Sequence, residues 1–105
     1  MASASLIYYA VVQDHAENWD ASVHLRQQQG WDEHAAFMDA LVDDGSIILG
    51  GPLGDGGEQA LLIFAAASKE AIEAKLAADP WRRAGMLRTA SITRWKILLD
   101  GRSRP

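Results

Sequence analysis

The stretch SIILGGPLGDGGEQALLIFAA (residues 46–66) decides the fold of this chain. Its two apolar runs, Ser46–Gly50 and Ala60–Ala66, are rich in Ile and Leu and predict two strands. The segment between them, residues 51–57, is rich in glycine and predicts a turn region. Because the connection has the length of a hairpin loop, we expect the two strands to be antiparallel neighbours.

An amphipathic helix is predicted immediately before this hairpin, over about residues 32–44. Asp32 is suited to cap its start, and Gly45 is suited to end it. At helical spacing one face carries five residues: His34, Phe37, Met38, Leu41 and Val42. We expect this face to be buried, so that an imidazole points toward the core from the first turn of the helix.

The N-terminal part predicts one strand and one loop. Residues 5–13 form a β-prone run that is apolar on both faces, which is typical of a central, covered strand. Residues 14–30 are polar and irregular, and we interpret them as a long loop that can hold a helical turn. Long loops in small domains often carry function.

The C-terminal part predicts a helix followed by a strand. The helix covers residues 68–78 and is capped by Ser68. Pro80 ends it, since proline disfavours helical geometry in the residue before it. A short turn or single helical turn over residues 81–86 leads into a long final strand over residues 87–99.

The resulting order is strand, helix, strand, strand, helix, strand. This is the ferredoxin-like βαββαβ arrangement, an α+β fold in which two helices cover one face of a four-stranded antiparallel sheet. The other sheet face has no cover, yet the strands over residues 5–13 and 60–66 are apolar on both faces. We therefore expect a homodimer that packs sheet against sheet, an α+β barrel-type assembly.

The composition indicates one soluble domain over residues 1–105, with a core over about 6–99 and a flexible tail over 100–105. Hydrophobic residues make up 49% of the chain, which excludes global disorder. The absence of cysteine excludes disulfides and thiolate chemistry. No apolar run is long enough to span a bilayer, and the N-terminus does not resemble a secretion signal. We therefore expect a cytoplasmic protein that binds no membrane.

The charges are unevenly distributed around a net charge of −4. Residues 80–105 hold six arginines and Lys96 against Asp100 alone, whereas residues 1–79 hold the other acids. This asymmetry could mark a basic patch for an anionic partner. We favour a basic strand that lies near acidic elements of the same fold or of a second subunit, because the overall charge is negative. No nucleic-acid partner is expected.

Short pieces in a fixed order run along the chain from about Leu6 to Leu99. They are Tyr9-Ala10-Val11, Trp31-Asp32-Glu33-His34 with Phe37, Gly45, Gly50-Gly51-Pro52-Leu53, Leu62-Ile63, Ser68-Lys69-Glu70-Ala71, Ala78-Asp79-Pro80-Trp81, Gly85 and Trp95. The most specific part is the series His, Gly-Gly-Pro-Leu, Asp-Pro. In these pieces the chain resembles the YciI-like (YCII-related) proteins.

The resemblance implies a ferredoxin-like fold, a dimer, and an active site built on a His–Asp pair, here His34 and Asp79. One characterised member type is a dehydrochlorinase that acts on a chlorinated hydroxyquinol. This chain departs from shorter members between Arg26 and His34, where residues 27–33 replace a shorter link. The loop that faces the substrate therefore differs from theirs.

His34 and Asp79 also make chemical sense as a pair. A carboxylate bonded to one ring nitrogen fixes the tautomer, and the other nitrogen can then take or give a proton. Both residues should lie in the helical layer, at helix ends that the fold brings together. The structural alternatives are a satisfied buried histidine and, for Asp79, a cap with Pro80 at the first helical position.

The walls of the pocket are predicted from residues near this pair. Trp31 and Trp81 each lie within three residues of one member, so each could form an aromatic wall. Gly51 and Pro52 have a structural interpretation as a bend, with proximity to a ligand as a secondary role. Tyr9 is the strand residue that we expect to reach the pocket.

We therefore expect a cofactor-independent enzyme, of lyase (dehydrochlorinase-like) or isomerase type, that acts on a cyclic or hydroxylated small molecule through the pair. The first alternative is a metabolite-binding or regulatory module without catalysis, and the second is a cofactor-free monooxygenase. His15 and His24 match no common zinc spacing with His34, so no metal is expected.

Overall fold

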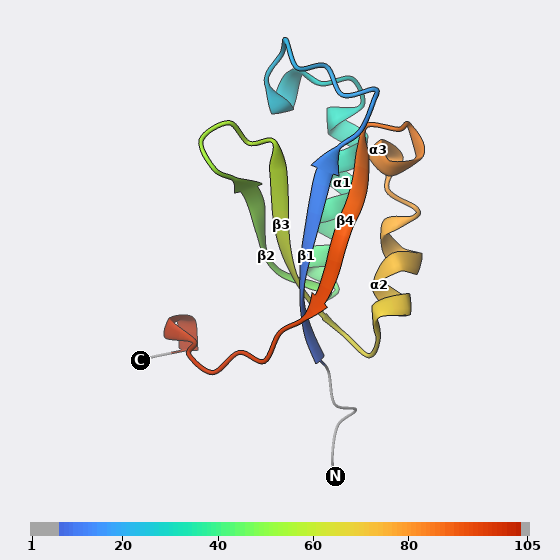
Figure 1. The fold of residues 1–105 in the computed structure, drawn as a ribbon. Coiled ribbons are helices and arrows are strands. Elements are labelled where there is room, and N and C mark those ends of the chain that lie inside the picture. The colour runs from blue at the N-terminus through green and yellow to red at the C-terminus, as the bar shows by residue number, and fades with distance from the viewer. Residues whose placement is uncertain (1–6, 104–105) are drawn as a thin grey trace.

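A computed structural model describes residues 7–103 as a four-stranded antiparallel sheet with helices on one face (Figure 1). The strand order is β2-β3-β1-β4, which is the ferredoxin-like order and confirms the predicted fold class. The elements are β1 (Ile7–His15), η1 (Leu25–Gln27), α1 (Trp31–Asp43), β2 (Ile47–Leu53), β3 (Gln59–Ala66), α2 (Lys69–Leu76), α3 (Pro80–Arg83), β4 (Leu87–Arg94) and η2 (Gly101–Ser103). The short turn or single helical turn predicted over residues 81–86 is the short helix α3, which begins one residue earlier, at Pro80.

The hairpin strands are longer than the sequence predicted. β2 continues to Leu53, so Gly51 and Pro52 lie within the strand and the predicted bend there is wrong. Pro52 is tolerated because β2 is an edge strand, where a missing backbone N–H costs little. The turn therefore covers residues 54–58, and Gly51 and Pro52 belong to strand β2 and not to the loop.

Helix α1 begins one residue earlier than predicted, and Asp32 is not its cap. The N-cap is Gly30, whose φ of 81° lies in the left-handed region that glycine adopts without strain. Its carbonyl accepts from the His34 N–H at 3.0 Å, which opens the helix. Val42 was expected on the buried face but is 53% exposed. It lies about 80° around the helix from His34, at the edge of the apolar stripe.

Strand β4 ends at Arg94, not at Leu99 as predicted. Its partner is β1, and the last contact between their backbones is the bond from the Trp95 N–H to the Tyr8 carbonyl, at 2.8 Å. Within the described residues the apolar segment that follows pairs with no strand and leaves the end of β4 (Figure 1). Its residues Trp95, Ile97 and Leu99 line a small cavity together with Leu49 of β2 and Ile63 of β3. Gly101–Ser103 form a short turn of helix, and residues 104–105 and 5–6 of the predicted ends lie outside the described part.

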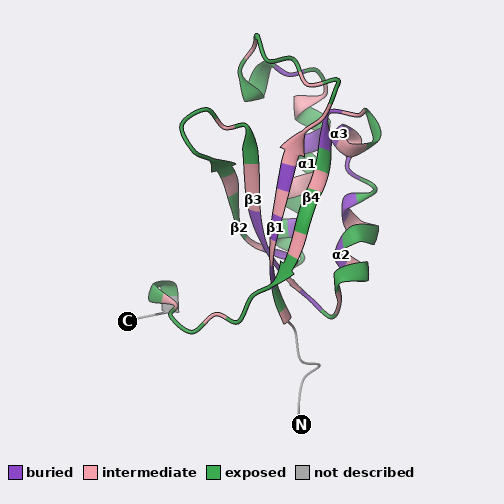
Figure 2. Ribbon diagram, in the orientation of Figure 1, coloured by how far each residue is buried: buried purple, intermediate pink, exposed green. Residues whose placement is uncertain are grey.

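The core lies between the sheet and the helical layer (Figure 2). Tyr9 pairs with Phe64 and Val11 with Leu62, so that their side chains share the helix-facing side of the sheet. Each fully buried aliphatic or aromatic side chain here contributes about 1.5–3 kcal/mol. A second cluster, Trp81, Met86 and Leu87 with Trp19 and Trp31 packed against it, lies at the other end of the helical layer.

The loop between β1 and α1 is held in place by hydrogen bonds to the residues just before β4 and by hydrogen bonds within the loop. The backbone N–H groups of Ala16 and Asn18 donate to the carbonyls of Met86 and Gly85, at 2.9 and 3.0 Å. The buried amide of Gln28 then cross-links the loop from within, through both of its polar atoms. The loop is therefore a fixed wall of the second cluster.

Candidate functional site

His34 and Asp79 are in hydrogen-bond contact. The distance from His34 Nδ1 to Asp79 Oδ1 is 2.8 Å, although the two residues are 45 positions apart in the chain. Both are buried, His34 with 8% and Asp79 with 0% of its surface exposed. The first turn of α1 supplies the imidazole, and the residue just before α3 supplies the carboxylate.

Asp79 holds this position because it also caps α3. Its Oδ1 accepts from the backbone N–H of Trp81 at 3.0 Å, and Pro80 occupies the first turn of the helix. The structural role predicted for Asp79 is therefore present together with the contact to His34. The second carboxylate oxygen, Oδ2, is buried and has no hydrogen-bond partner in the described part of the chain.

This geometry selects one tautomer of His34. A carboxylate only accepts hydrogen bonds, so the contact to the Asp79 carboxylate is satisfied when His34 Nδ1 carries a hydrogen and donates it. The other ring nitrogen, Nε2, then carries a lone pair. It makes no hydrogen bond within residues 7–103 and can accept a proton.

Two tryptophans surround the imidazole. The Trp81 ring stacks on the His34 ring, with centroids 4.0 Å apart and planes 7° from parallel. Trp81 is fixed in turn by its Nε1–H, which donates to the Gln29 carbonyl at 2.8 Å. Trp31 packs against both rings, with its centroid 6.1 Å from that of His34. The imidazole therefore has little freedom to rotate.

A cavity of about 230 Å³ opens beside the imidazole. His34 lines it and Asp79 does not, so that Nε2 is the nitrogen available to a molecule in the cavity. Most of its walls are apolar, and no Lys or Arg lines it. The lining residues from the helical layer and the loop are Leu25, Trp31, His34, Met38 and Trp81, and those from the sheet and hairpin are Gln13, His15, Gly50, Gly51, Pro52, Gly57, Gln59, Ala60, Leu62 and Leu87.

Four of the five predicted pocket residues line this cavity: Trp31, Gly51, Pro52 and Trp81. Tyr9 is not among the residues that line this cavity. Its side chain is buried in the main apolar core. On the same face of β1, Tyr9 is followed by Val11, which is also in the core, and then by Gln13, which lines the cavity. Strand alternation places Tyr9 on the correct face of the sheet but too far along it to reach His34.

Gln13 and His15 line the cavity and were not predicted as site residues. Both lie on the face of β1 that carries Tyr9 and Val11, since residues two apart on a strand share a face. The signal was in the sequence: two polar residues continue the alternation of the core face at the end of the strand. This alternation was missed because residues 5–13 were interpreted as a strand that is apolar on both faces.

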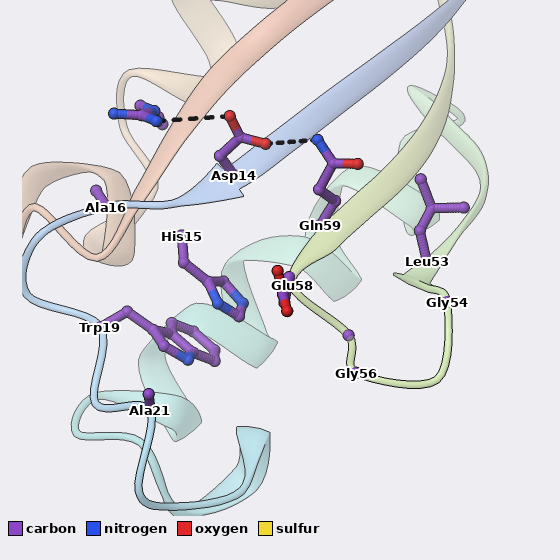
Figure 3. A pocket seen from close by; sticks show the side chains of 12 residues that line it. Asp14, His15, Ala16, Trp19, Ala21, Leu53, Gly54, Gly56, Glu58 and Gln59 are labelled. Atoms are coloured by element: carbon purple, nitrogen blue, oxygen red, sulfur yellow. Dashed lines mark hydrogen bonds and ion pairs between the residues drawn. The ribbon is translucent and has the colours of Figure 1, made fainter.

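His15 lies between the cavity and a larger hollow of about 750 Å³. Its ring stacks on Trp19, with centroids 3.8 Å apart, and Glu58 lies beside it (Figure 3). Partial burial lowers the pKa of His15, although the carboxylates of Glu58 and Asp14 oppose this shift. The larger hollow contains neither His34 nor Asp79, so it is not the site of the pair.

No set of three His, Asp or Glu side chains within residues 7–103 is arranged to hold a metal ion. In the same residues, no helix combines the length and the apolar character that crossing a membrane requires.

Comparison with known proteins gives a family and a fold. The chain matches the model of the YCII-related domain over residues 7–96. A search of the curated proteins gave no match. Among solved structures, the chain is similar to 5-chloro-2-hydroxyhydroquinone dehydrochlorinase from Burkholderia phenoliruptrix AC1100, in complex with 2,5-dihydroxybenzoquinone. The identity is 21% and the TM-score 0.59, with 84% of this chain and 93% of that chain covered. This chain belongs to the YCII-related domain family.

Proposed function

We propose that this protein is a cofactor-independent enzyme in which His34 and Asp79 transfer protons to and from a small cyclic substrate. One observation carries the proposal: the 2.8 Å contact between His34 Nδ1 and Asp79 Oδ1, placed at the wall of a cavity. A carboxylate that orients an imidazole and stabilises its protonated form is a common arrangement for general acid–base catalysis.

The chemistry follows from the free nitrogen. His34 Nε2 removes a proton from a carbon or hydroxyl of the substrate, and the Asp79 carboxylate stabilises the imidazolium that forms. If the proton returns at another atom of the substrate, the reaction is an isomerisation. If the electron pair instead expels a leaving group such as chloride, the reaction is an elimination. Neither step needs an oxidant or a reductant.

The cavity supports a substrate with a single ring. A protein cavity of about 150 Å³ can hold benzene, so about 230 Å³ suits one ring with a few substituents. Trp31 and Trp81 offer flat surfaces for such a ring. The structurally similar dehydrochlorinase is named for a hydroxylated chlorinated ring and was solved with a dihydroxybenzoquinone. We extend this substrate class, hydroxylated six-membered rings, to the present protein.

The alternative is a module that binds a metabolite and does not convert it. The observation that favours it is the second bond at Asp79 Oδ1, from the Trp81 N–H. Capping of α3 is sufficient reason for an aspartate here, and His34 then serves as a hydrogen-bond partner for its buried oxygen. In that case a ring compound binds in the cavity and is recovered unchanged.

The test is turnover of a panel of hydroxylated and chlorinated rings, with 5-chloro-2-hydroxyhydroquinone as the first member. Chloride release and the absorbance of the ring report elimination and isomerisation separately. We expect His34→Ala and Asp79→Asn to lower kcat/KM by about 10²–10⁴-fold, the range for loss of a general acid–base group. Asp79→Asn keeps an oxygen that can cap α3, so its loss of activity is not a loss of fold.

The matched control is His24→Ala, which removes an exposed imidazole of the loop and should leave kcat/KM unchanged. Full activity in folded His34→Ala and Asp79→Asn would disprove the proton-transfer pair. Saturable binding of a panel member that is recovered unchanged would establish the binding module instead.

A further inference from the structure

Gln13 is buried and lines the cavity, and the N–H donor of its amide lacks a partner. Gln13 has 2% of its surface exposed, and its Nε2 makes no hydrogen bond within the described residues. It lies on β1, where it pairs with Ala60 of β3 and Thr89 of β4. A buried N–H donor without an acceptor destabilises a folded protein, so such a group calls for an explanation.

Gln28, the other buried glutamine, is an example of an amide with a structural role in this protein. Gln28 has 3% of its surface exposed, and all of its polar atoms are used. Its Nε2 donates to the carbonyls of Asp20 and Val23 at 2.6 and 3.1 Å, and its Oε1 accepts from the Asp20 N–H at 3.1 Å. Gln28 holds a loop together, whereas the free donor of Gln13 has no comparable structural task.

The position of Gln13 supplies the explanation. It lines the same cavity as His34, but from the sheet, whereas His34 and the two tryptophans approach from the helical layer. A ring that rests against the tryptophans therefore lies between the His34 imidazole and the Gln13 side chain. The remaining walls are largely apolar and offer an oxygen atom few other donors.

We propose that Gln13 Nε2–H donates a hydrogen bond to an oxygen of the ring substrate, a carbonyl or an ionised hydroxyl, and thereby selects oxygenated rings. This inference rests on the proposed function for the identity of the site. When His34 Nε2 removes a proton, the electron pair of the broken bond moves onto the ring and its conjugated oxygen. A neutral donor at that oxygen stabilises the developing charge and fixes which atom faces His34.

The binding test uses two probes of the same shape, acetophenone and α-methylstyrene, which differ by a carbonyl oxygen in place of a methylene group. The wild-type protein should bind acetophenone more tightly, by about tenfold, as expected for one hydrogen bond to a buried donor. Gln13→Leu should remove this preference by weakening acetophenone alone. Calorimetry or ligand-detected NMR on the full chain measures both affinities.

The matched control is Gln59→Leu. Gln59 also lines the cavity, but its Nε2 already donates to Asp14 Oδ1 at 2.7 Å (Figure 3), so the preference should survive its loss. Equal affinity of the wild-type protein for the two probes would overturn the inference, and so would equal weakening of both by Gln13→Leu. The inference would also fail if acetophenone did not bind at any concentration up to the solubility limit of α-methylstyrene. Each of these results would mean that Gln13 gives the ligand no selective hydrogen bond.

The same variants separate this inference from the proposed function. If the preference for acetophenone is real but His34→Ala and Asp79→Asn retain full turnover, the oxygen subsite stands and the proton-transfer pair fails. If the preference is absent while those two variants lose turnover, the pair stands and only the role of Gln13 fails.

Discussion

A single atom, Asp79 Oδ1, connects the stability of this protein to its candidate chemistry. It accepts from the Trp81 backbone N–H at 3.0 Å and lies 2.8 Å from His34 Nδ1. The sequence predicts each role separately, one from the Asp-Pro cap and one from the family resemblance. The structure combines them, because the cap of α3 lies beside the first turn of α1.

The two roles can be separated by stability measurements. Asp79→Ala removes the cap, worth about 1 kcal/mol, and leaves the buried His34 Nδ1–H unpaired at about 1–3 kcal/mol. We therefore expect the free energy of unfolding in urea to fall by about 2–4 kcal/mol. Asp79→Asn should cost less, since its amide oxygen can still accept from Trp81. An equal loss in both variants would show that the carboxylate charge, and not the cap, stabilises this corner.

The residues of the site were predictable to different degrees, for physical reasons. Helical spacing alone places His34 on the inner face, since Met38 and Leu41 lie on the same side of α1. Its partner lies 45 residues away, and no local pattern indicates that contact; the family resemblance supplied it. Gln13 was missed because a missing hydrogen bond can be recognised only once the neighbours of a side chain are known.

At the scale of elements, the two ends of α1 are set by glycines in the same backbone conformation but in different surroundings. Gly30 has φ 81° and Gly45 has φ 84°. A Cβ at Gly30 would lie 3.3 Å from Nε1 of Trp81, whereas a Cβ at Gly45 would meet nothing within 4 Å. The start of the helix is therefore packed against the aromatic wall of the site, and its end is open.

This difference yields a matched pair of substitutions. Gly45→Ala should cost about 1–2 kcal/mol, the penalty for a left-handed residue with a side chain. Gly30→Ala should cost a further ~1 kcal/mol from close packing, because the bond from Trp81 to the Gln29 carbonyl prevents the indole from yielding. Urea unfolding measures both, and near-ultraviolet circular dichroism should change only for Gly30→Ala. Identical losses and spectra would mean that the indole moves freely.

The ends of the elements were harder to predict than their order. The apolar run after Arg94 has strand character, yet within the described residues the pairing of β4 with β1 ends at Arg94 and Tyr9, with one further bond from the Trp95 N–H to the Tyr8 carbonyl. Pro52 suggested a bend, but an edge strand accommodates it. In both cases the decisive quantity is the position of a strand in the sheet, which local sequence does not contain.

At the scale of the whole molecule, one face of the sheet is open. The helices cover the other face (Figure 1). Parts of the strands carry the exposed colour in Figure 2, and several large apolar side chains are exposed on or beside the open face. They include Tyr8, Leu49, Leu53 and Trp95, and Leu98 and Leu99 are exposed in the segment that follows β4. Burial of this surface against a second copy is the predicted arrangement, and it stays a prediction.

We expect the protein to sediment at twice the 11.4 kDa mass of the chain. Leu49→Asp places a charge on the open face, where Leu49 is 52% exposed, and should shift the protein to the mass of one chain, since an unpaired charge is costly to bury. Val42→Asp is the control, because Val42 is 53% exposed on the helical side. A single-chain mass for the wild type, or dissociation by Val42→Asp alone, would contradict this assembly.

The order of elements, and with it the ferredoxin-like fold, could be predicted because the signals are strong and local. The apolar runs, the Ser68 cap and the glycine-rich turn each identify an element without reference to the rest of the chain. The cap is confirmed by the bond from the Ala71 N–H to Ser68 Oγ at 3.1 Å. The cavity depends on how the helical layer packs against the sheet, and local sequence patterns do not predict that packing.

Because Asp79 Oδ1 both caps α3 and contacts His34, its presence in relatives of this chain must be interpreted with both contacts in mind. A relative without the proposed activity would still be under selection to keep the aspartate, because α3 would otherwise lose its cap. The aspartate by itself is therefore a poor marker of a working enzyme. An imidazole at position 34 together with an unsatisfied amide at position 13 is the more informative signature, since fold stability alone gives evolution no reason to retain that amide.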